Sequence, residues 1–257
     1  MTLTHKLSDL SQSAAQSAGL YKTINGQVFI GVDNTTTLSP TGVGRNSVKI
    51  MSNDAYTHAL VIADLAHIPA SECGSWPAFW MLGSGTWPAN GEIDIIEGIN
   101  NQTNDQMSIH SREGCNVTVG QYGQYGTFGS NKDCGYGGGY DGCTVFSSSA
   151  KSYGTGFNKA GGGVYALHWT GAEIKVWFFL HGSVPSDVLD QGEPNPNGWG
   201  TPQASFAGCE FDSYFQDMSI VSSFPVVRPV LLGRCTDLCT ALQHRFLRFL
   251  GWSAVDC

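Results

Sequence analysis

Short stretches in which apolar and polar residues alternate recur along the chain, separated by clusters of Gly, Pro, Asn and Ser. Alternation with a period of two is typical of strands with one buried face, and the clusters are typical of turns. The pattern predicts strands at residues 27–32, 47–52, 59–64, 92–97, 106–110, 164–170, 173–180 and 218–221. Many short strands of this kind indicate an all-β protein built from two packed sheets.

Two longer segments stand out from this pattern. Residues 164–180 have the form of a hairpin that turns at Gly171-Ala172, and we expect Trp169, Trp177 and Phe179 to be plain core residues. Residues 120–163 are rich in Gly, Ser, Asn and Tyr, and Cys134 and Cys143 stand nine positions apart within them. We interpret this second segment as a long surface loop closed by a local disulfide.

The segment from Gly91 to Gly98 reads G-E-I-D-I-I-E-G and places three acids within six positions. Glu92 and Asp94 share one face of a regular strand, but Glu97 would point to the other face. A β-bulge at Ile95-Ile96 would return Glu97 to the face of Glu92. Two carboxylates roughly 5–5.5 Å apart suit retaining glycoside hydrolysis, although an exposed acidic strand is the plain alternative. From the residues alone, either glutamate could be the nucleophile.

This segment resembles the signature of glycoside hydrolase family 16, in the longer form with two apolar residues before the last Glu that is typical of laminarinase-type β-1,3-glucanases. Residues 38–48, 74–80, 107–110 and 174–179 are similar in order and spacing to fungal, especially basidiomycete, laminarinases. The resemblance covers about residues 14–221. It implies a concanavalin-like jelly-roll β-sandwich with a concave substrate cleft. The implied activity is retaining endo-hydrolysis of β-1,3 or mixed β-1,3/1,4 glucans, with no cofactor and no metal site.

The resemblance also implies roles for the three acids. Glu92 would be the nucleophile, and Glu97 would be the acid/base that protonates the leaving oxygen and then deprotonates water. Asp94, which lies between them, would hydrogen-bond one of the two glutamates. Three acids on one strand cannot all ionise cheaply, so we expect the pKa of at least one of them to be raised.

Four further residues match substrate-binding positions of the family. Trp80 and Trp87 would stack on glucose rings, although core packing is the ordinary alternative for a tryptophan, and we expect Trp76 to be mainly structural. His110 would lie beside the nucleophile. Lys49 stands where the family usually has an arginine, which implies weaker binding of the glycone because lysine lacks the planar fork of donors.

The composition fits one domain with an uncharged ligand. The chain has 257 residues, of which 13% are charged and 33 are Gly, with a net charge of −8. A β-protein of this length folds as one domain. The negative charge argues against nucleic acid and anionic membranes as partners, whereas a neutral polysaccharide is compatible with it. No segment approaches the roughly 20 apolar residues of a membrane span. We expect a monomer.

Eight cysteines and acceptor sequons at Asn34, Asn101 and Asn116 indicate an oxidising, extracellular compartment, as the family resemblance also implies. The N-terminus nevertheless lacks the apolar run of a signal peptide. Cys235 and Cys239 with His244 resemble only half of a zinc site.

The match weakens at both ends of the chain. We expect a divergent segment at residues 1–13, a catalytic domain at 14–221 that is incomplete at both ends, and a divergent tail at 222–257. We expect poor order after Val221, a possible short helix at residues 240–252 that nothing ties to the sandwich, and loss of the family partner of Cys209. The alternatives are a catalytically impaired carbohydrate-binding relative and a non-functional product of a faulty gene model.

Overall fold

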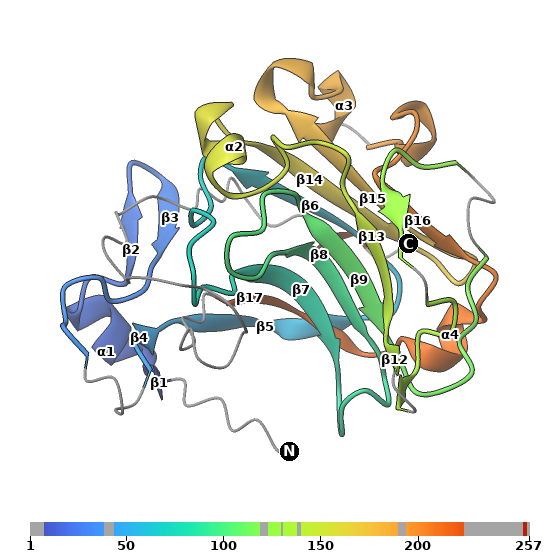
Figure 1. The fold of residues 1–257 in the computed structure, drawn as a ribbon, viewed down its shortest axis with the longest axis horizontal. Helices are drawn as coiled ribbons and strands as arrows, with labels where there is room; N and C mark the ends of the chain where they lie inside the picture. Colours follow the sequence, from blue (N-terminus) through green and yellow to red (C-terminus); the bar gives the residue numbers. More distant parts are fainter. Residues whose placement is uncertain are drawn as a thin grey trace.

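The computed structural model describes residues 8–38, 44–118, 123–129, 131–137, 140–189, 194–223 and 254–255. Two antiparallel sheets lie one over the other (Figure 1). The larger sheet has seven strands in the order β10-β13-β9-β8-β7-β17-β5. Their bounds are Thr127–Phe128, Cys143–Phe146, Gln106–His110, Glu92–Glu97, Ala78–Gly83, Met218–Ser223 and Lys49–Tyr56.

The second sheet has five strands in the order β16-β15-β14-β6-β18, with bounds Ala204–Ala207, Glu173–Leu180, Gly163–Trp169, Ala59–Leu65 and Ala254–Val255. The predicted hairpin is confirmed, because β14 and β15 pair in antiparallel register from Trp169 opposite Ile174 outward, on either side of the turn at Gly171. Trp169 and Trp177 are buried as expected, whereas Phe179 is only partly buried.

The smaller elements lie around the two sheets. Three strand pairs form small sheets: β1 with β4 (Ser8–Asp9 with Asn46–Ser47), β2 with β3 (Tyr21–Ile24 with Gln27–Ile30) and β11 with β12 (Tyr136–Gly137 with Tyr140–Asp141). The helices are short: α1 (Gln12–Ser17), α2 (Gly154–Lys159), η1 (His181–Ser183), α3 (Ser186–Leu189), η2 (Pro196–Gly198) and α4 (Phe211–Tyr214).

Strand alternation divides the seven-stranded sheet into two faces. On β7, Phe79 and Met81 are buried in the core between the sheets, while their neighbour Trp80 points to the opposite face. The inward side chains of β8, β9 and β13 meet those of β6 and β14 in the same apolar cluster, which includes Ile93, Met107, Ile109, Val145, Leu65, Tyr165 and Leu167. Burial of these apolar side chains holds the sheets together and leaves the other face of the large sheet for polar groups.

The expectation of a long loop at residues 120–163 is wrong. This segment contains β13, an inner strand of the seven-stranded sheet, together with β10, β11, β12 and α2. β13 has only four residues, Cys143–Phe146, and so short an alternation does not stand out from its Gly-rich surroundings. The disulfide between Cys134 and Cys143 is confirmed.

One expectation about the C-terminal part is also wrong, and another is not tested. β17 continues past Val221 to Ser223, and Ala254 and Val255 pair with β6, whose edge offers backbone groups for pairing. Residues 224–253 lie outside the described residues, so the poor order expected after Val221 stays a prediction. Cys209 has a partner, because it forms a disulfide with Cys115. The expectations for residues 1–7 and for the possible helix at 240–252, and those for Cys235, Cys239, His244 and Cys257, lie outside the described residues.

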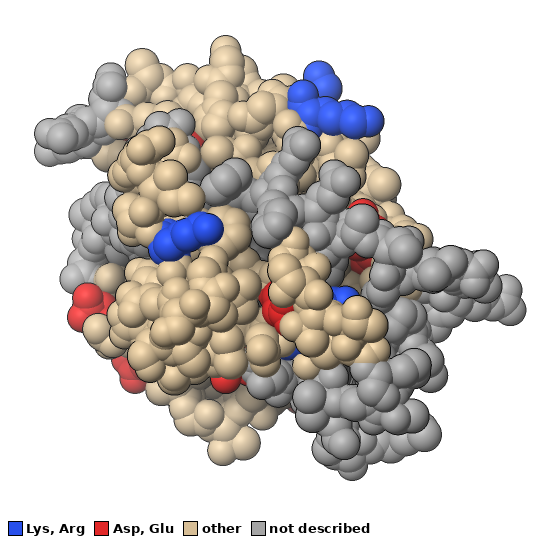
Figure 2. Space-filling model, turned by 90° about the vertical axis from the view of Figure 1, so that its left-hand side faces the viewer, with Lys and Arg blue, Asp and Glu red and all other residues tan. Residues whose placement is uncertain are grey.

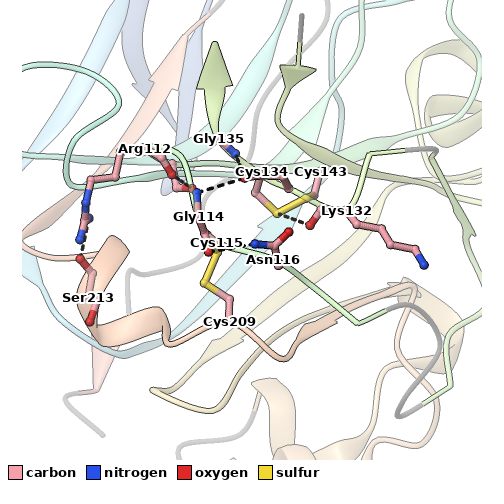
Figure 3. The surroundings of a disulfide bond; sticks show 12 residues. Arg112, Gly114, Cys115, Asn116, Lys132, Cys134, Gly135, Cys143, Cys209 and Ser213 are labelled. Atoms are coloured by element: carbon pink, nitrogen blue, oxygen red, sulfur yellow. Dashed lines mark hydrogen bonds between the residues drawn. A yellow bond between two sulfur atoms is a disulfide. The ribbon is translucent and has the colours of Figure 1, made fainter. Parts of the chain in front are cut away.

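Two disulfides of the described residues, Cys115–Cys209 and Cys134–Cys143, lie close together beside the end of β9 (Figure 3). Cys115–Cys209 joins the segment after β9 to the segment before α4, and Cys134–Cys143 fixes the start of β13. In the same region the Arg112 guanidinium donates to the Ser213 carbonyl at 2.7 Å. These bonds fix the segments that follow the strand carrying His110.

The face of the molecule in Figure 2 carries scattered charged side chains and no broad basic patch among the residues coloured there. This agrees with the low charged fraction of the whole sequence. Within the described part of the chain, every helix falls short of the length and apolarity needed to cross a bilayer.

Candidate active site

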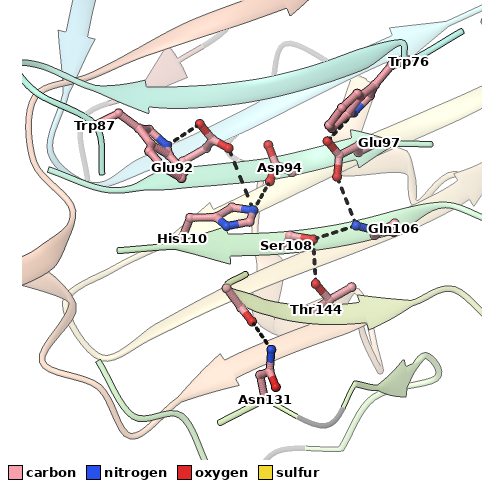
Figure 4. A network of polar contacts seen from close by, with 11 residues as sticks. Trp76, Trp87, Glu92, Asp94, Glu97, Gln106, Ser108, His110, Asn131 and Thr144 are labelled. Carbon is pink, nitrogen blue, oxygen red and sulfur yellow. Dashed lines mark hydrogen bonds and ion pairs between the residues drawn. The ribbon is translucent and has the colours of Figure 1, made fainter. Parts of the chain in front are cut away.

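The predicted bulge is present in β8. Ala78 of β7 stands opposite Glu97 and Phe79 opposite Ile96, but Trp80 stands opposite Asp94, so Ile95 is the extra residue on β8. Ile95 and Ile96 are both buried. The bulge therefore places Glu92, Asp94 and Glu97 on the face of the sheet that looks away from the core (Figure 4).

The Glu97 carboxylate accepts two hydrogen bonds at one end of this face. The Trp76 indole N–H donates to its Oε1 at 2.6 Å, and the Gln106 side-chain amide donates to its Oε2 at 3.1 Å. Gln106 continues to Ser108, whose hydroxyl lies 3.0 Å from that of Thr144 on β13. This chain of polar groups crosses β8, β9 and β13 and fixes the orientation of the Glu97 carboxylate (Figure 4).

Glu92 lies at the other end of the row and has different partners. The Trp87 indole N–H donates to its Oε2 at 2.9 Å. His110 on β9 stands directly opposite Glu92 in the register, and its Nε2 lies 3.1 Å from Asp94 Oδ2 and 3.9 Å from Glu92 Oε1. A protonated His110 would therefore lower the energy of a negative charge on either acid.

Burial raises the pKa of all three acids. For Glu92, burial and the charge of Asp94 raise the pKa to about 8 against the lowering effect of His110 and the Trp87 hydrogen bond. For Glu97, burial and Asp94 likewise raise the pKa to about 8, against the Trp76 hydrogen bond and His110. Burial also raises the pKa of Asp94. The charge of Asp94 opposes ionisation of both glutamates, so the three acids do not all carry a charge together, which suits a site that needs one carboxylate and one carboxylic acid.

Trp80 and Lys49 lie toward the β5 edge of the same sheet. The Trp80 indole N–H donates to the Ser223 hydroxyl at 3.1 Å, and the Lys49 ammonium lies 4.9 Å from the centroid of the Trp80 ring. Trp87 is 40% exposed, whereas Trp80 is only partly exposed. The predicted catalytic and substrate-binding residues therefore lie on the seven-stranded sheet or, for Trp87, on the loop between β7 and β8.

Several residues of this site were not identified from the sequence. Trp76, expected to be mainly structural, donates directly to Glu97. Gln106 and Ser108 belong to a predicted strand but carry no motif, so only the alternation of that strand could have placed them on the face of the acids. Asp105, just before the strand, bonds the Glu97 backbone.

The ligand atoms of Glu92, Asp94 and His110 lie within 4.8 Å of one another, a spacing that a small cation could bridge. These are the same groups that form the His110 ion pairs within the acid cluster.

Most of this chain matches known proteins. Residues 8–226 match the model of the XgeA-like, catalytic GH16 domain. A probable endo-1,3(4)-β-glucanase from Aspergillus fumigatus is 42% identical over 214 residues, covering 82% of this chain and 32% of the relative. The endo-1,3(4)-β-glucanase XgeA from Emericella nidulans is 41% identical and is covered to 33%. The chain thus spans about a third of the length of these curated relatives.

Solved structures agree. Laminarinase 16A from Phanerochaete chrysosporium, solved with β-glucans in both donor and acceptor sites, superposes with a TM-score of 0.81 at 36% identity, covering 86% of this chain and 76% of that one. An elongating family 16 β-1,3-glucosyltransferase superposes with a TM-score of 0.80 at 42% identity, covering 86% and 73%. With the predicted fold, the bulged acidic strand and these matches in place, the chain belongs to the XgeA-like catalytic domains of glycoside hydrolase family 16.

Proposed function

We propose that this chain is a catalytic domain that cleaves internal bonds of β-1,3 or mixed β-1,3/1,4 glucans with retention of configuration. The observation that carries the proposal is the bulge in β8, which gathers Glu92, Asp94 and Glu97 on one face beside His110. The endo-1,3(4)-β-glucanase names of the relatives and the β-glucans bound in the laminarinase structure support the substrate class.

Exposure favours Glu92 as the nucleophile. Glu92 is partly exposed, whereas Glu97 and Asp94 are buried, so the charged form of Glu92 costs the least desolvation of the three. Trp87 and His110 also lie where they stabilise that charge. Glu97 is more deeply buried, so we assign the proton to it, while the N–H groups of Trp76 and Gln106 orient its carboxyl.

The proposed reaction has two displacements. In the first, a Glu92 oxygen bonds to the anomeric carbon as the glycosidic C–O bond breaks, and the leaving oxygen takes the proton of Glu97. In the second, Glu97 removes a proton from water, the water oxygen bonds to the anomeric carbon, and Glu92 leaves as a carboxylate. Asp94, between the two and paired with His110, keeps the two glutamates in different protonation states.

We further propose that Trp87, Trp80, His110 and Lys49 bind the glucan. Trp87 presents the most exposed aromatic surface beside Glu92, so it would stack on a sugar ring. Lys49 lies over Trp80, so a sugar that uses the Trp80 face must displace or share this ammonium. We also propose that the protein is a monomer and acts outside the cell; the disulfides Cys115–Cys209 and Cys134–Cys143 support the oxidising compartment.

The test is hydrolysis of laminarin and of mixed-linkage glucan, with the configuration of the first product followed by NMR. A β-configured reducing end formed first supports retention, and an α-configured one contradicts it. Glu92→Gln should abolish turnover while the fold remains, because an amide of the same shape is a poor nucleophile. Binding of laminarin without any hydrolysis by the wild type would favour the impaired carbohydrate-binding alternative.

Transglycosylation is a second candidate activity, favoured by the 42% identity to the elongating glucosyltransferase. In this case a sugar hydroxyl replaces water in the second displacement. Incubation with laminari-oligosaccharides would then yield products longer than the substrate, whereas a pure hydrolase yields only shorter ones.

A further inference from the structure

Asp105 is a fully buried carboxyl just before β9 that the proposed reaction does not use. Its Oδ1 accepts the backbone N–H of Glu97 at 3.0 Å, across eight positions of sequence. The exposed fraction of Asp105 is 0%, so this hydrogen bond is shielded from water. A carboxyl is rarely buried so completely without a structural or chemical use.

The bulge explains why Glu97 needs such a partner. β8 pairs with β9 only as far as Asp94 opposite Ser108, and the extra residue Ile95 takes the rest of β8 out of that register. The N–H of Glu97 points toward the β9 side, since it is Gly98 N–H that donates to Pro77 at the β7 side. The Asp105 carboxyl therefore takes the position that a backbone carbonyl of β9 would hold in a regular ladder.

Asp105 is itself firmly held. Its N–H donates to the Ser152 hydroxyl at 2.9 Å, and its carbonyl accepts the N–H of Ser147 at 2.8 Å. The Tyr165 hydroxyl, which lies beside the carboxyl, donates to the Ser152 carbonyl at 2.5 Å. Because its main chain is bonded on both sides, Asp105 presents its carboxyl to Glu97 from a fixed position.

We propose that Asp105 is a positioning residue that holds the bulged end of β8, and with it the carboxyl of Glu97, in the geometry for acid/base catalysis. The next residue, Gln106, bonds the Glu97 side chain, so one short segment holds both the backbone and the carboxylate of Glu97. This proposal rests on the proposed function, in which Glu97 is the acid/base. Beyond that function, the proposal identifies Asp105 as the acceptor for the Glu97 N–H, which the bulge removes from the ladder with β9.

The substitution Asp105→Leu removes the acceptor while keeping the number of side-chain heavy atoms, and Asp105→Asn keeps the acceptor. The side-chain carbonyl oxygen of Asn can accept the Glu97 N–H from the position of Asp105 Oδ1, and burial, which raises the pKa of Asp105, disfavours a charge that Asn lacks. Asp105→Asn should therefore behave like the wild type. Asp105→Leu should misplace Glu97, and kcat/KM for laminari-oligosaccharides should fall roughly 100-fold.

A second substrate separates positioning from general damage. A 2,4-dinitrophenyl β-laminaribioside has a leaving group that departs without a proton, so its kcat/KM does not depend on the acid. With Asp105→Leu, kcat/KM for this glycoside should fall much less than that for the oligosaccharide. Equal losses on the two substrates, or the same behaviour of the Asn and Leu variants, would overturn the proposal.

A measurement that needs no activity keeps this proposal apart from the proposed function. If the wild type hydrolyses neither substrate, the proposed function is wrong, and amide hydrogen exchange then decides on Asp105. Asp105→Leu should speed exchange of the Glu97 amide and leave that of Ile93, which pairs within the regular part of β8, unchanged. Unchanged exchange at Glu97 would refute the positioning role.

Discussion

At the scale of single residues, the site places three acids, Glu92, Asp94 and Glu97, where burial destabilises their charged forms. The acids needed for the reaction therefore lower the stability of the fold. Burial and mutual repulsion raise their pKa values, so the folded protein binds more protons than the unfolded chain over a range of pH. Hydrogen bonds from Trp76 and Trp87 offset only part of this cost. An active site of this kind is expected to be less stable than a neutral version of itself.

The sign of this effect predicts a pH dependence. Because the pKa of Glu92 is near its usual value in the unfolded chain and about 8 in the folded protein, its contribution to the free energy of unfolding falls as the pH rises from about 4 to about 8. Glu92→Gln removes this contribution. It should therefore raise the free energy of unfolding at pH 8 by something on the order of 1–3 kcal/mol and change it little at pH 4.

Denaturant unfolding of the wild type and Glu92→Gln at pH 4 and pH 8 measures this difference. Equal effects of the substitution at the two pH values would mean that Glu92 does not carry a raised pKa in the folded protein.

Trp87 combines an exposed ring with a hydrogen bond to Glu92, and substitutions can separate these two contributions. Trp87→Ala should weaken binding of laminari-oligosaccharides by about 1–3 kcal/mol, as for other aromatic stacking platforms. Trp87→Phe keeps a stacking face without the N–H and should retain most of the affinity. Titration calorimetry measures both. An unchanged dissociation constant with a lowered melting temperature for Trp87→Ala would indicate packing instead.

At the scale of elements, the placement of β13 against β9 decides the position of His110. Gly142, just before β13, has a φ of +87°, and a Cβ on it would collide with Nδ1 of the His110 ring and with the Ile109 carbonyl. A glycine is therefore required there both by the backbone and by the close approach of the two strands. The orientation of the imidazole beside Glu92 and Asp94 therefore depends on the absence of a side chain at Gly142.

Gly142→Ala should displace His110 and lower kcat/KM on laminarin by roughly 10–100-fold. Gly161→Ala is the matched control, because Gly161 has the same φ of +87° and open space around its Cβ position. It should lose about 1–2 kcal/mol of stability from the left-handed backbone and keep its activity. Melting temperature and kcat/KM are measured for both variants. Equal losses of activity would show that backbone strain, not the His110 contact, is responsible.

At the scale of the whole molecule, disulfides connect parts that the sheets alone leave apart. Cys115–Cys209 closes a separation of 94 residues, whereas Cys134–Cys143 closes one of 9. Because a longer closed loop removes more entropy from the unfolded chain, the first bond should contribute more to stability. Both anchor segments next to β9 and β13, so they also support the polar face of the large sheet.

Replacing Cys115 and Cys209 together by Ser should lower the free energy of unfolding by about 4–5 kcal/mol, and replacing Cys134 and Cys143 by about 2–3 kcal/mol. Denaturant unfolding under oxidising conditions gives both values, and the wild type with reductant is the control. If the shorter loop proved the more important, native packing around Cys134–Cys143 rather than loop entropy would dominate.

The alternation of apolar and polar residues was sufficient to predict a strand where that strand has one clear apolar face. Alternation in Glu173–Leu180 predicted β15, and the odd spacing of Glu92 and Glu97 predicted the bulge, because a period of two leaves no other way to bring both onto one face. Local pattern failed for β13, whose four residues are too few to show a period. It also failed for Cys209, whose partner lies 94 residues away.

The sequence by itself determined the family signature, the acids and the face they occupy, since these depend on neighbouring residues of one strand. Only the tertiary structure decided which groups surround them: Trp76 and Gln106 on the Glu97 carboxylate, and Asp105 on its backbone. These partners come from other segments whose separation in sequence fixes neither distance nor direction. The closing of the sheets and the bulge bring them together, because buried polar groups must find partners wherever the packed chain supplies them.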